Sequence, residues 1–169
     1  SGTTADLTTG TGPTAPTSFT CSAYDATSET FTYSAPTGAS TYMLRYLTSD
    51  YPVRNTGTQG YNGSSTTPPA VTGLTSGQIY YWSVWAINSS GYYGDVAQLT
   101  HYTLPAAPTS FSETDASKTT MTVGWTKGTG GDKTTIRINT GSYPTSQTDG
   151  YEAYALNTGT STTMPSSGS

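Results

Sequence analysis

The sequence predicts an all-β protein made of tandem β-sandwiches, and three observations lead to this prediction. Strand-favouring aromatic residues make up 12% of the 169 residues, with Tyr contributing 14, while charged residues reach only 9%. Gly and Pro interrupt every segment that could form a helix, so no stretch shows helical periodicity. The chain also repeats itself at a fixed offset, which is the signature of a modular array.

Seven segments of the first repeat alternate apolar and polar residues between turn signals, and each is predicted to be a strand. They span 17–22, 29–34, 41–48, 58–62, 66–72, 78–88 and 95–103. Turns are expected at Pro36-Thr37-Gly38, Asn62-Gly63, Ser76-Gly77 and Ser90-Gly91. Seven short strands at this spacing are typical of an antiparallel sandwich.

The repeat is visible in two short motifs that lie 92 positions apart. Pro16-Thr17-Ser18-Phe19 recurs as Pro108-Thr109-Ser110-Phe111, and RYLTSDYP at 45–52 recurs as RINTGSYP at 137–144. The same offset aligns the residues before Pro13 with those before Pro105. We therefore expect a complete module at 13–105 and a second module at 106–169 without counterparts of the last two strands. Residues 1–12 would be the last strand of a preceding module or a donor strand.

The stretch 73–91 resembles the corner and the sixth strand of a fibronectin type III domain. That family shows Leu, Gly, Tyr, Val, Ala, Asn and Gly in order, and here they are Leu74, Gly77, Tyr80, Val84, Ala86, Asn88 and Gly91. Trp125 also fits the family at the end of its strand, whereas the first module has Tyr33 there. The Thr-x-x-Tyr-Pro segment is similar to a variant of microbial and phage surface proteins. The resemblance implies a sandwich of about seven strands with a spacer or adhesive role.

Alternation along 78–88 separates two faces, and the resemblance implies that the face with Tyr80 points inward. The inward face is expected in the core, and its predicted members are Tyr80, Trp82, Val84 and Ala86, together with Phe31, Tyr33, Tyr42, Leu44 and Tyr46. Tyr80 would be a tyrosine corner whose hydroxyl bonds to backbone upstream. The outward face is a candidate interface or sugar platform, unless neighbouring loops cover it, and its members are Tyr81, Trp85, Ile87, Met43 and Arg45. Arg45 could stack on Trp85 or Tyr81.

The sequence offers no catalytic constellation, so it predicts no enzyme, no metal site and no cofactor. His101 is the single histidine and is expected to be a surface residue of its strand. Cys21 is the single cysteine, which excludes a disulfide within the chain, and is expected to be a small strand residue. Six Lys and Arg against a net charge of −4 argue against nucleic acid as a partner. No apolar run is long enough for membrane insertion.

Two sequons are candidate glycosylation sites, at Asn62-Gly63-Ser64 and Asn88-Ser89-Ser90. Asn62-Gly63 also fits a simple hairpin turn. The segments 8–17, 64–69 and 158–169 are rich in Thr and Ser and are candidates for O-glycans. With so few charges, the surface needs glycans or burial in an assembly to stay soluble.

The function predicted from these features is that of a structural or adhesive repeat protein in an extracellular filament, surface fibre or phage fibre. The alternative is a carbohydrate-binding or spacer module of a secreted polysaccharide-degrading enzyme. The expected partners are further copies, as a homo-polymer, or further modules of the same chain, with carbohydrate as another candidate. Residues 3–11, with Ala5 and Leu7, could complete another copy's second module head to tail, unless the sequence is a window of a longer array. The expected location is extracellular, on a cell surface or on a virion.

Overall fold

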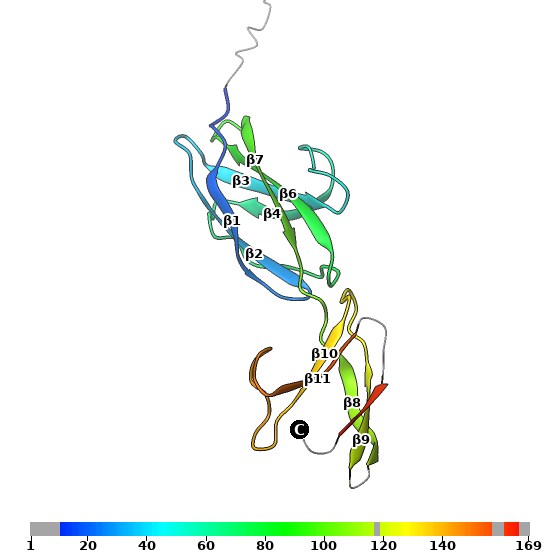
Figure 1. The fold of residues 1–169 in the computed structure, drawn as a ribbon. Helices are drawn as coiled ribbons and strands as arrows, with labels where there is room; N and C mark the ends of the chain where they lie inside the picture. Colours follow the sequence, from blue (N-terminus) through cyan, green and yellow to red (C-terminus); the bar gives the residue numbers. More distant parts are fainter. Residues whose placement is uncertain (1–10, 117–118, 157–160, 166–169) are drawn as a thin grey trace, which may run out of the picture. The chain divides into compact units, whose positions relative to one another are not determined.

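The computed structural model describes residues 11–116, 119–156 and 161–165, and these residues form strands, turns and loops without a helix (Figure 1). The prediction of an all-β fold is confirmed. By backbone contacts the chain divides into two units, Ser1–Leu104 and Pro105–Ser169, which are described one at a time. Within the described residues, no helix could cross a membrane.

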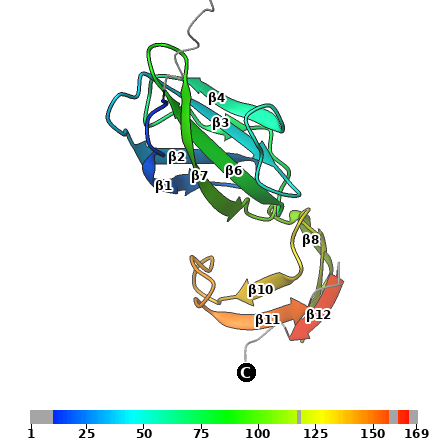
Figure 2. The same ribbon diagram turned by 90° about the horizontal axis from the view of Figure 1, so that it is seen from above.

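Unit 1 is a sandwich of two antiparallel sheets. Its strands are β1 (Thr17–Tyr24), β2 (Ser28–Ser34), β3 (Thr41–Leu47), β4 (Thr58–Gly63), β5 (Val71–Thr72), β6 (Ile79–Ile87) and β7 (Tyr93–Tyr102). One sheet has the order β1-β2-β5 and the other β4-β3-β6-β7. Figure 2 shows the two sheets as separate layers of the unit. Each strand overlaps a segment predicted from alternation.

Strand β5 is much shorter than the predicted segment 66–72. Pro68 and Pro69 stand in the middle of that segment, and proline has no N–H to donate to a strand ladder. The carbonyl of Thr66 still accepts a hydrogen bond from the Tyr33 N–H at 3.1 Å. Regular pairing with β2 then resumes only at Val71.

The predicted core of unit 1 is confirmed. Ten buried side chains form one cluster, namely Phe31, Tyr33, Tyr42, Leu44, Val71, Leu74, Tyr80, Trp82, Val84 and Ala86. Tyr46 is partly buried and packs against this cluster. The hydroxyl of Tyr80 accepts a hydrogen bond from the Thr75 N–H at 2.8 Å, so the tyrosine corner is also confirmed.

The Pro-Thr-Ser-Phe motif marks a break in the first strand of each unit. Ser18 and Ser110 both have a φ of 54°, a left-handed conformation that residues other than glycine rarely adopt. In β1 the pairing with β2 shifts between Thr17 and Thr20, and again between Cys21 and Ala23. The first strand of unit 2 shifts at the corresponding positions. The sequence repeat therefore encodes a pair of bulges.

Unit 2 contains five strands among its described residues. They are β8 (Thr109–Ala116), β9 (Thr120–Thr126), β10 (Thr134–Ile138), β11 (Tyr151–Leu156) and β12 (Ser161–Pro165). Their sheets have the orders β12-β9-β8 and β10-β11, which parallel β5-β2-β1 and β3-β4 of unit 1. Within the described part of the unit, β10 pairs with β11 along one edge only.

The core of unit 2 is small but shielded. Val123, Trp125 and Ile136 are buried, and Met121 and Ala153 pack against them. Strands of both sheets contribute to the cluster, so the two short sheets shield each other's apolar side chains.

Candidate functional site

The outward face of β6 is not the exposed platform that the sequence offered as one alternative. Met43, Trp85 and Ile87 do lie on the face opposite the main core, but only 7%, 5% and 7% of their surface is exposed. They form a second cluster of buried residues against which Tyr93 packs. Trp85 therefore has no ring face free to stack on a sugar, which corrects its candidacy as a platform residue.

The loop between β3 and β4 packs on neighbouring residues of this face, as the other alternative expected. Tyr51 of the loop packs edge-on against Tyr81, with ring centroids 5.3 Å apart, and its hydroxyl lies 2.7 Å from that of Thr100. Arg54 of the same loop lies over the Tyr93 ring, 5.3 Å from its centroid. The cation–π contact on this face is therefore made by Arg54 and not by Arg45.

Arg45 instead holds the end of the loop. Its Nη1 donates to the carbonyls of Gly57 at 2.9 Å and Thr56 at 3.3 Å. Arg45 and Tyr81 are both half-buried. The predicted interface residues thus form a structural layer under the loop.

The remaining predicted sites are the candidate donor-strand residues and the two sequons, and only the sequons lie among the described residues. Ala5 and Leu7 lie outside the described residues. Asn62 is exposed at the end of β4. Asn88 is engaged through its side chain, because Nδ2 donates to the Thr11 carbonyl at 3.3 Å and Oδ1 accepts from backbone N–H groups of the following turn. Of the two sequons, the one at Asn62 is better placed to receive a glycan.

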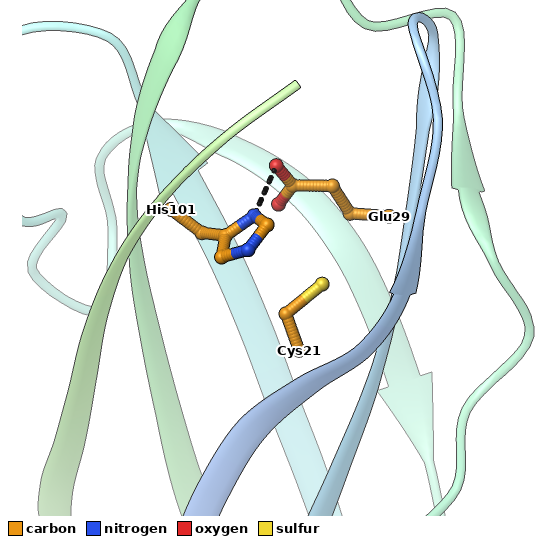
Figure 3. Close-up of side chains that lie close together, drawn as sticks. All are labelled: Cys21, Glu29 and His101. Carbon is orange, nitrogen blue, oxygen red and sulfur yellow. Dashed lines mark hydrogen bonds and ion pairs between the residues drawn. The ribbon is translucent and has the colours of Figure 1, made fainter. Parts of the chain in front are cut away.

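A cluster of three polar side chains, which the sequence analysis did not anticipate, lies at one side of unit 1. Cys21, Glu29 and His101 each place a candidate ligand atom within 4.8 Å of the other two (Figure 3). Nδ1 of His101 lies 3.0 Å from Oε1 of Glu29. His101 was expected to be an ordinary surface residue, and the structure corrects this: its side chain is only 21% exposed and is bound to a fully buried carboxylate.

Strand alternation explains why these residues meet. Glu29 precedes Phe31 and Tyr33 on the core-facing side of β2, and His101 follows Ala97 and Leu99 on the core-facing side of β7. Cys21 is the partner of Phe31 in the β1–β2 ladder. The signal available in the sequence was a carboxylate at a core-facing position, because a buried charge needs a partner.

The environment disfavours charge on two of the three groups. Burial, and then repulsion from Glu29, raises the pKa of the Cys21 thiol to about 11. Burial also raises the pKa of the Glu29 carboxyl, although the hydrogen bond and charge of His101 oppose the rise. A thiol with such a pKa is almost entirely protonated at neutral pH, so the Cys21 side chain is not an activated nucleophile.

Glu29 also has an oxygen without a hydrogen-bond partner. Its Oε2 is buried, and no donor among the described residues bonds to it. The indole N–H of Trp82 acts on the carboxyl and lowers its pKa, but Nε1 of Trp82 forms no hydrogen bond of acceptable geometry within the same residues. A buried acceptor in this state is uncommon in folded proteins.

Unit 2 has a different kind of feature, an apolar hollow. Its volume is about 510 Å³, and Phe111, Met121, Val123, Ile136 and Ile138 contribute apolar lining. Phe111 is 61% exposed at its rim. Glu113 and Arg137 add charged groups to the lining.

Comparison with solved structures identifies the fold. A two-domain fibronectin type III segment of chicken tenascin matches with a TM-score of 0.55 at 18% identity, covering 89% of this chain and 82% of that chain. A structure described as FN3tt mut matches with a TM-score of 0.45 at 18% identity, covering 54% and 97%. The extracellular domains d3–d4 of rat CD45 match with a TM-score of 0.44 at 20% identity, covering 54% and 49%.

The fold is therefore that of tandem fibronectin type III-like β-sandwiches, as the sequence predicted. No family model matches the chain, and no curated protein matches it either. At this level of identity the similarity concerns the fold alone, and function has to be argued from the residues.

Proposed function

We propose that this chain is a structural segment of an extracellular repeat protein, in which fibronectin type III-like units space or join other parts of a filament, surface fibre or phage fibre. The observation that carries the proposal is the repetition of structural details at one offset. Ser18 and Ser110 share the same left-handed φ within matching bulges. A structural unit that is repeated in this way favours a spacer role over a role that depends on a site present once in the chain.

Surface chemistry supports the location outside the cell. Charged residues are only 9% of the chain, and much of the polar surface is Thr, Ser and Tyr. Such a surface has too few charges to keep neighbouring molecules apart by repulsion. It is therefore suited to packing in an assembly or to carrying glycans. The exposed sequon at Asn62 provides one place for a glycan.

The proposal assigns no catalysis to the chain. The Cys21 thiol, which would be the obvious nucleophile beside His101, has a pKa raised to about 11 by burial and by Glu29. A catalytic cysteine is ordinarily activated in the opposite direction, by a lowered pKa. The function proposed is therefore structural, as a spacer.

The alternative of a carbohydrate-binding module is weaker on the residues. Its platform required a free Trp85 ring, and Trp85 is buried between Met43, Ile87 and Tyr93. A glycan array probed with the whole chain separates the two functions. The structural proposal expects no saturable binding, whereas binding that Tyr81→Ala abolishes and Asn62→Ala does not would favour the module of a polysaccharide-degrading enzyme.

Strand addition between copies is a finer prediction within the proposal. The apolar hollow and the edge of β10 would accept residues 3–11 of another copy, giving a head-to-tail homo-polymer. Deleting residues 3–11 should then abolish concentration-dependent assembly in analytical ultracentrifugation. Unchanged assembly, or a monomer at all concentrations in the intact chain, contradicts strand addition without contradicting the spacer role.

Localisation of the protein tests the main proposal. Antibodies raised against unit 1 should label filaments, fibres or particle surfaces of the source organism in immunogold electron microscopy, with label absorbed out by the purified chain as the control. Label confined to the cytosol contradicts the proposal.

A further inference from the structure

We propose that Cys21, Glu29 and His101 form a zinc-binding site that joins the two sheets of unit 1. This inference is independent of the spacer function, because a sandwich without metal could serve as a spacer equally well. Cys21 lies on β1 and Glu29 on β2, both in one sheet, whereas His101 lies on β7 in the other (Figure 3).

The geometry is close to that of a bound ion. A tetrahedral Zn²⁺ with bonds of about 2.0–2.3 Å holds its ligand atoms roughly 3.5 Å apart. His101 Nδ1 and Glu29 Oε1 are already 3.0 Å apart, and the largest separation within the set of three is 4.8 Å at most. Closing the set requires an approach of about 1 Å. If Cys21 supplies it by rotation, its Sγ gives up the hydrogen bond that it donates to the Ala23 carbonyl at 3.3 Å.

The unpartnered oxygen of Glu29 is the second, independent observation. Glu29 has no exposed surface, and its carboxylate faces the sulfur of Cys21 and the ring of His101 (Figure 3). Only Oε1 has a hydrogen-bond partner among the described residues. Coordination of the carboxylate to a cation would offset the cost of burying it.

The donor set selects the class of metal. A thiolate, an imidazole and a carboxylate are the three side-chain ligands that Zn²⁺ takes in proteins. Mg²⁺ and Ca²⁺ prefer a set made of oxygen atoms and would gain little from Cys21 or His101. Three protein ligands leave a fourth position for water.

Binding would exchange protons for the ion. Zn²⁺ binds the thiolate, so the S–H bond of Cys21 breaks and its proton leaves to solvent, as does any proton that His101 shares with Glu29. Zinc affinity should therefore rise with pH, because binding releases protons.

The aromatic surroundings support a defined site. The Tyr24 ring meets the His101 ring edge-on at 4.6 Å, and the Tyr102 ring stacks on it at 5.5 Å. These rings hold the imidazole in place while leaving it partly exposed.

Cobalt spectroscopy of the full chain provides a direct test. Cys21 is the only cysteine, so a thiolate-to-cobalt absorption band in the near ultraviolet can arise from no other residue. We expect this band on addition of Co²⁺ and its loss when Zn²⁺ competes. Absence of the band at millimolar Co²⁺ and pH 8 would overturn the proposal without the need for any variant.

Substitutions test the remaining ligands by calorimetry with Zn²⁺ alone. Cys21→Ser and His101→Gln should each weaken binding at least tenfold, while Ser22→Ala, on the neighbouring exposed position of β1, should leave it unchanged. Glu29→Gln keeps the shape of the buried side chain and should also weaken binding. Zinc binding that survives both Cys21→Ser and His101→Gln unchanged would show that the ion sits elsewhere and overturns the proposal.

Thermal unfolding tests whether the ion joins the two sheets, because a joining ion should raise the Tm of unit 1. Zn²⁺ at about a hundredfold excess over its Kd should raise the Tm of unit 1 by about 10 °C, and EDTA should reverse the shift. Mg²⁺ at the same concentration should have no effect. An equal shift with Mg²⁺, or no shift with Zn²⁺, contradicts a site that joins the sheets.

Discussion

The segments RYLTSDYP of unit 1 and RINTGSYP of unit 2 share one structural role and differ in another. Arg45 Nη1 donates to the Gly57 carbonyl at 2.9 Å, and Arg137 Nη1 donates to the Gly150 carbonyl at 3.0 Å. In both units an arginine thus closes the loop that follows the third strand. Tyr51, by contrast, docks on Tyr81 and Thr100, whereas the corresponding Tyr143 is 93% exposed.

The difference separates contacts within one strand and its loop from contacts that need other strands. The arginine contact needs only one strand and the loop beside it, and both units have these. The tyrosine contact needs β6 and β7, for which the described part of unit 2 has no paired counterpart next to β10. Matching sequence therefore gives matching contacts only where the partner surface is also present.

The largest expected effect comes from β6 of unit 1, which has no paired counterpart next to β10 in the described part of unit 2. Trp82→Ala should destabilise unit 1 by about 3–5 kcal/mol, because Trp82 is fully buried among Phe31 and Tyr46. Trp85→Ala should cost toward the lower end of that range, since its cluster contains only three buried residues. Hydrogen exchange resolved by peptide should show faster exchange in unit 1 alone. A negligible effect of Trp85→Ala would contradict its burial.

The loop glycines test whether the shared feature is equivalent in the two units. Gly57 and Gly150 have φ values of 74° and 72°, and a Cβ would lie 2.6 Å from the Tyr46 carbonyl oxygen and 2.5 Å from that of Ile138, respectively. Gly57→Ala and Gly150→Ala should each destabilise their own unit by about 2–4 kcal/mol, from left-handed strain and crowding together. Exchange protection of β4 and β11 is the measurement. A loss in one unit only would break the equivalence, and Gly141→Ala, where a Cβ meets nothing within 4 Å, is the control.

The two tyrosines should respond differently. Tyr51→Ala removes an aromatic contact and a hydroxyl hydrogen bond, and should destabilise unit 1 by about 1–2 kcal/mol. Tyr143→Ala removes a side chain that is 93% exposed and should change stability by less than about 0.5 kcal/mol. Chemical denaturation, with hydrogen exchange as the probe of each unit, compares the stability of the two variants. Equal effects would mean that Tyr143 docks on a surface as Tyr51 does.

The strained serines should give smaller changes of opposite sign. Ser18→Gly and Ser110→Gly remove the cost of a left-handed φ at a residue with a Cβ, offset by the greater freedom of glycine in the unfolded chain. Each should stabilise its unit by about 0.5–1 kcal/mol. The Tm of each variant measures the gain, and Thr20→Gly, at a regularly paired position of β1, should destabilise instead.

The smallest effect concerns two acids that cap turns. Asp25 accepts the Thr27 N–H at 2.6 Å, and Asp149 accepts the Thr145 N–H at 2.8 Å, and these bonds hold the pKa of both carboxyls below the ordinary value. A lowered folded pKa contributes stability above the unfolded pKa of about 4, and this is lost as pH falls through the folded pKa. Asp25→Asn and Asp149→Asn should each flatten the acid side of the stability profile. Unaltered profiles between pH 5 and 2 would contradict this role.

Much of the fold could be predicted because strand alternation reports on faces. Alternation separated the two faces of β6, and the family resemblance indicated that the set from Tyr80 to Ala86 faces inward and that Tyr80 bonds to the backbone. Burial of the outward set was not readable, because it depends on where a loop of about ten residues folds back. Alternation gives the face of a side chain and says nothing about what covers that face.

The polar cluster was missed for a related reason. Glu29 and His101 are 72 positions apart in the chain. They meet because β2 and β7 belong to different sheets of the same sandwich, a relation that local patterns do not contain. A charged residue on a core-facing position was the available clue, and it pointed to a partner without identifying it.

The paired bulges of β1 and β8 have a consequence for how such units coexist in one chain. Both strands lie at the edge of their sheets, where exposed N–H and C=O groups invite amyloid-like pairing between neighbours of similar sequence. Proteins often guard such edges with charge, but β1 contains no charged residue. Two bulges in an eight-residue strand leave no long, regular stretch of backbone with which a strand of another unit could pair. The irregular backbone therefore protects this edge against aggregation.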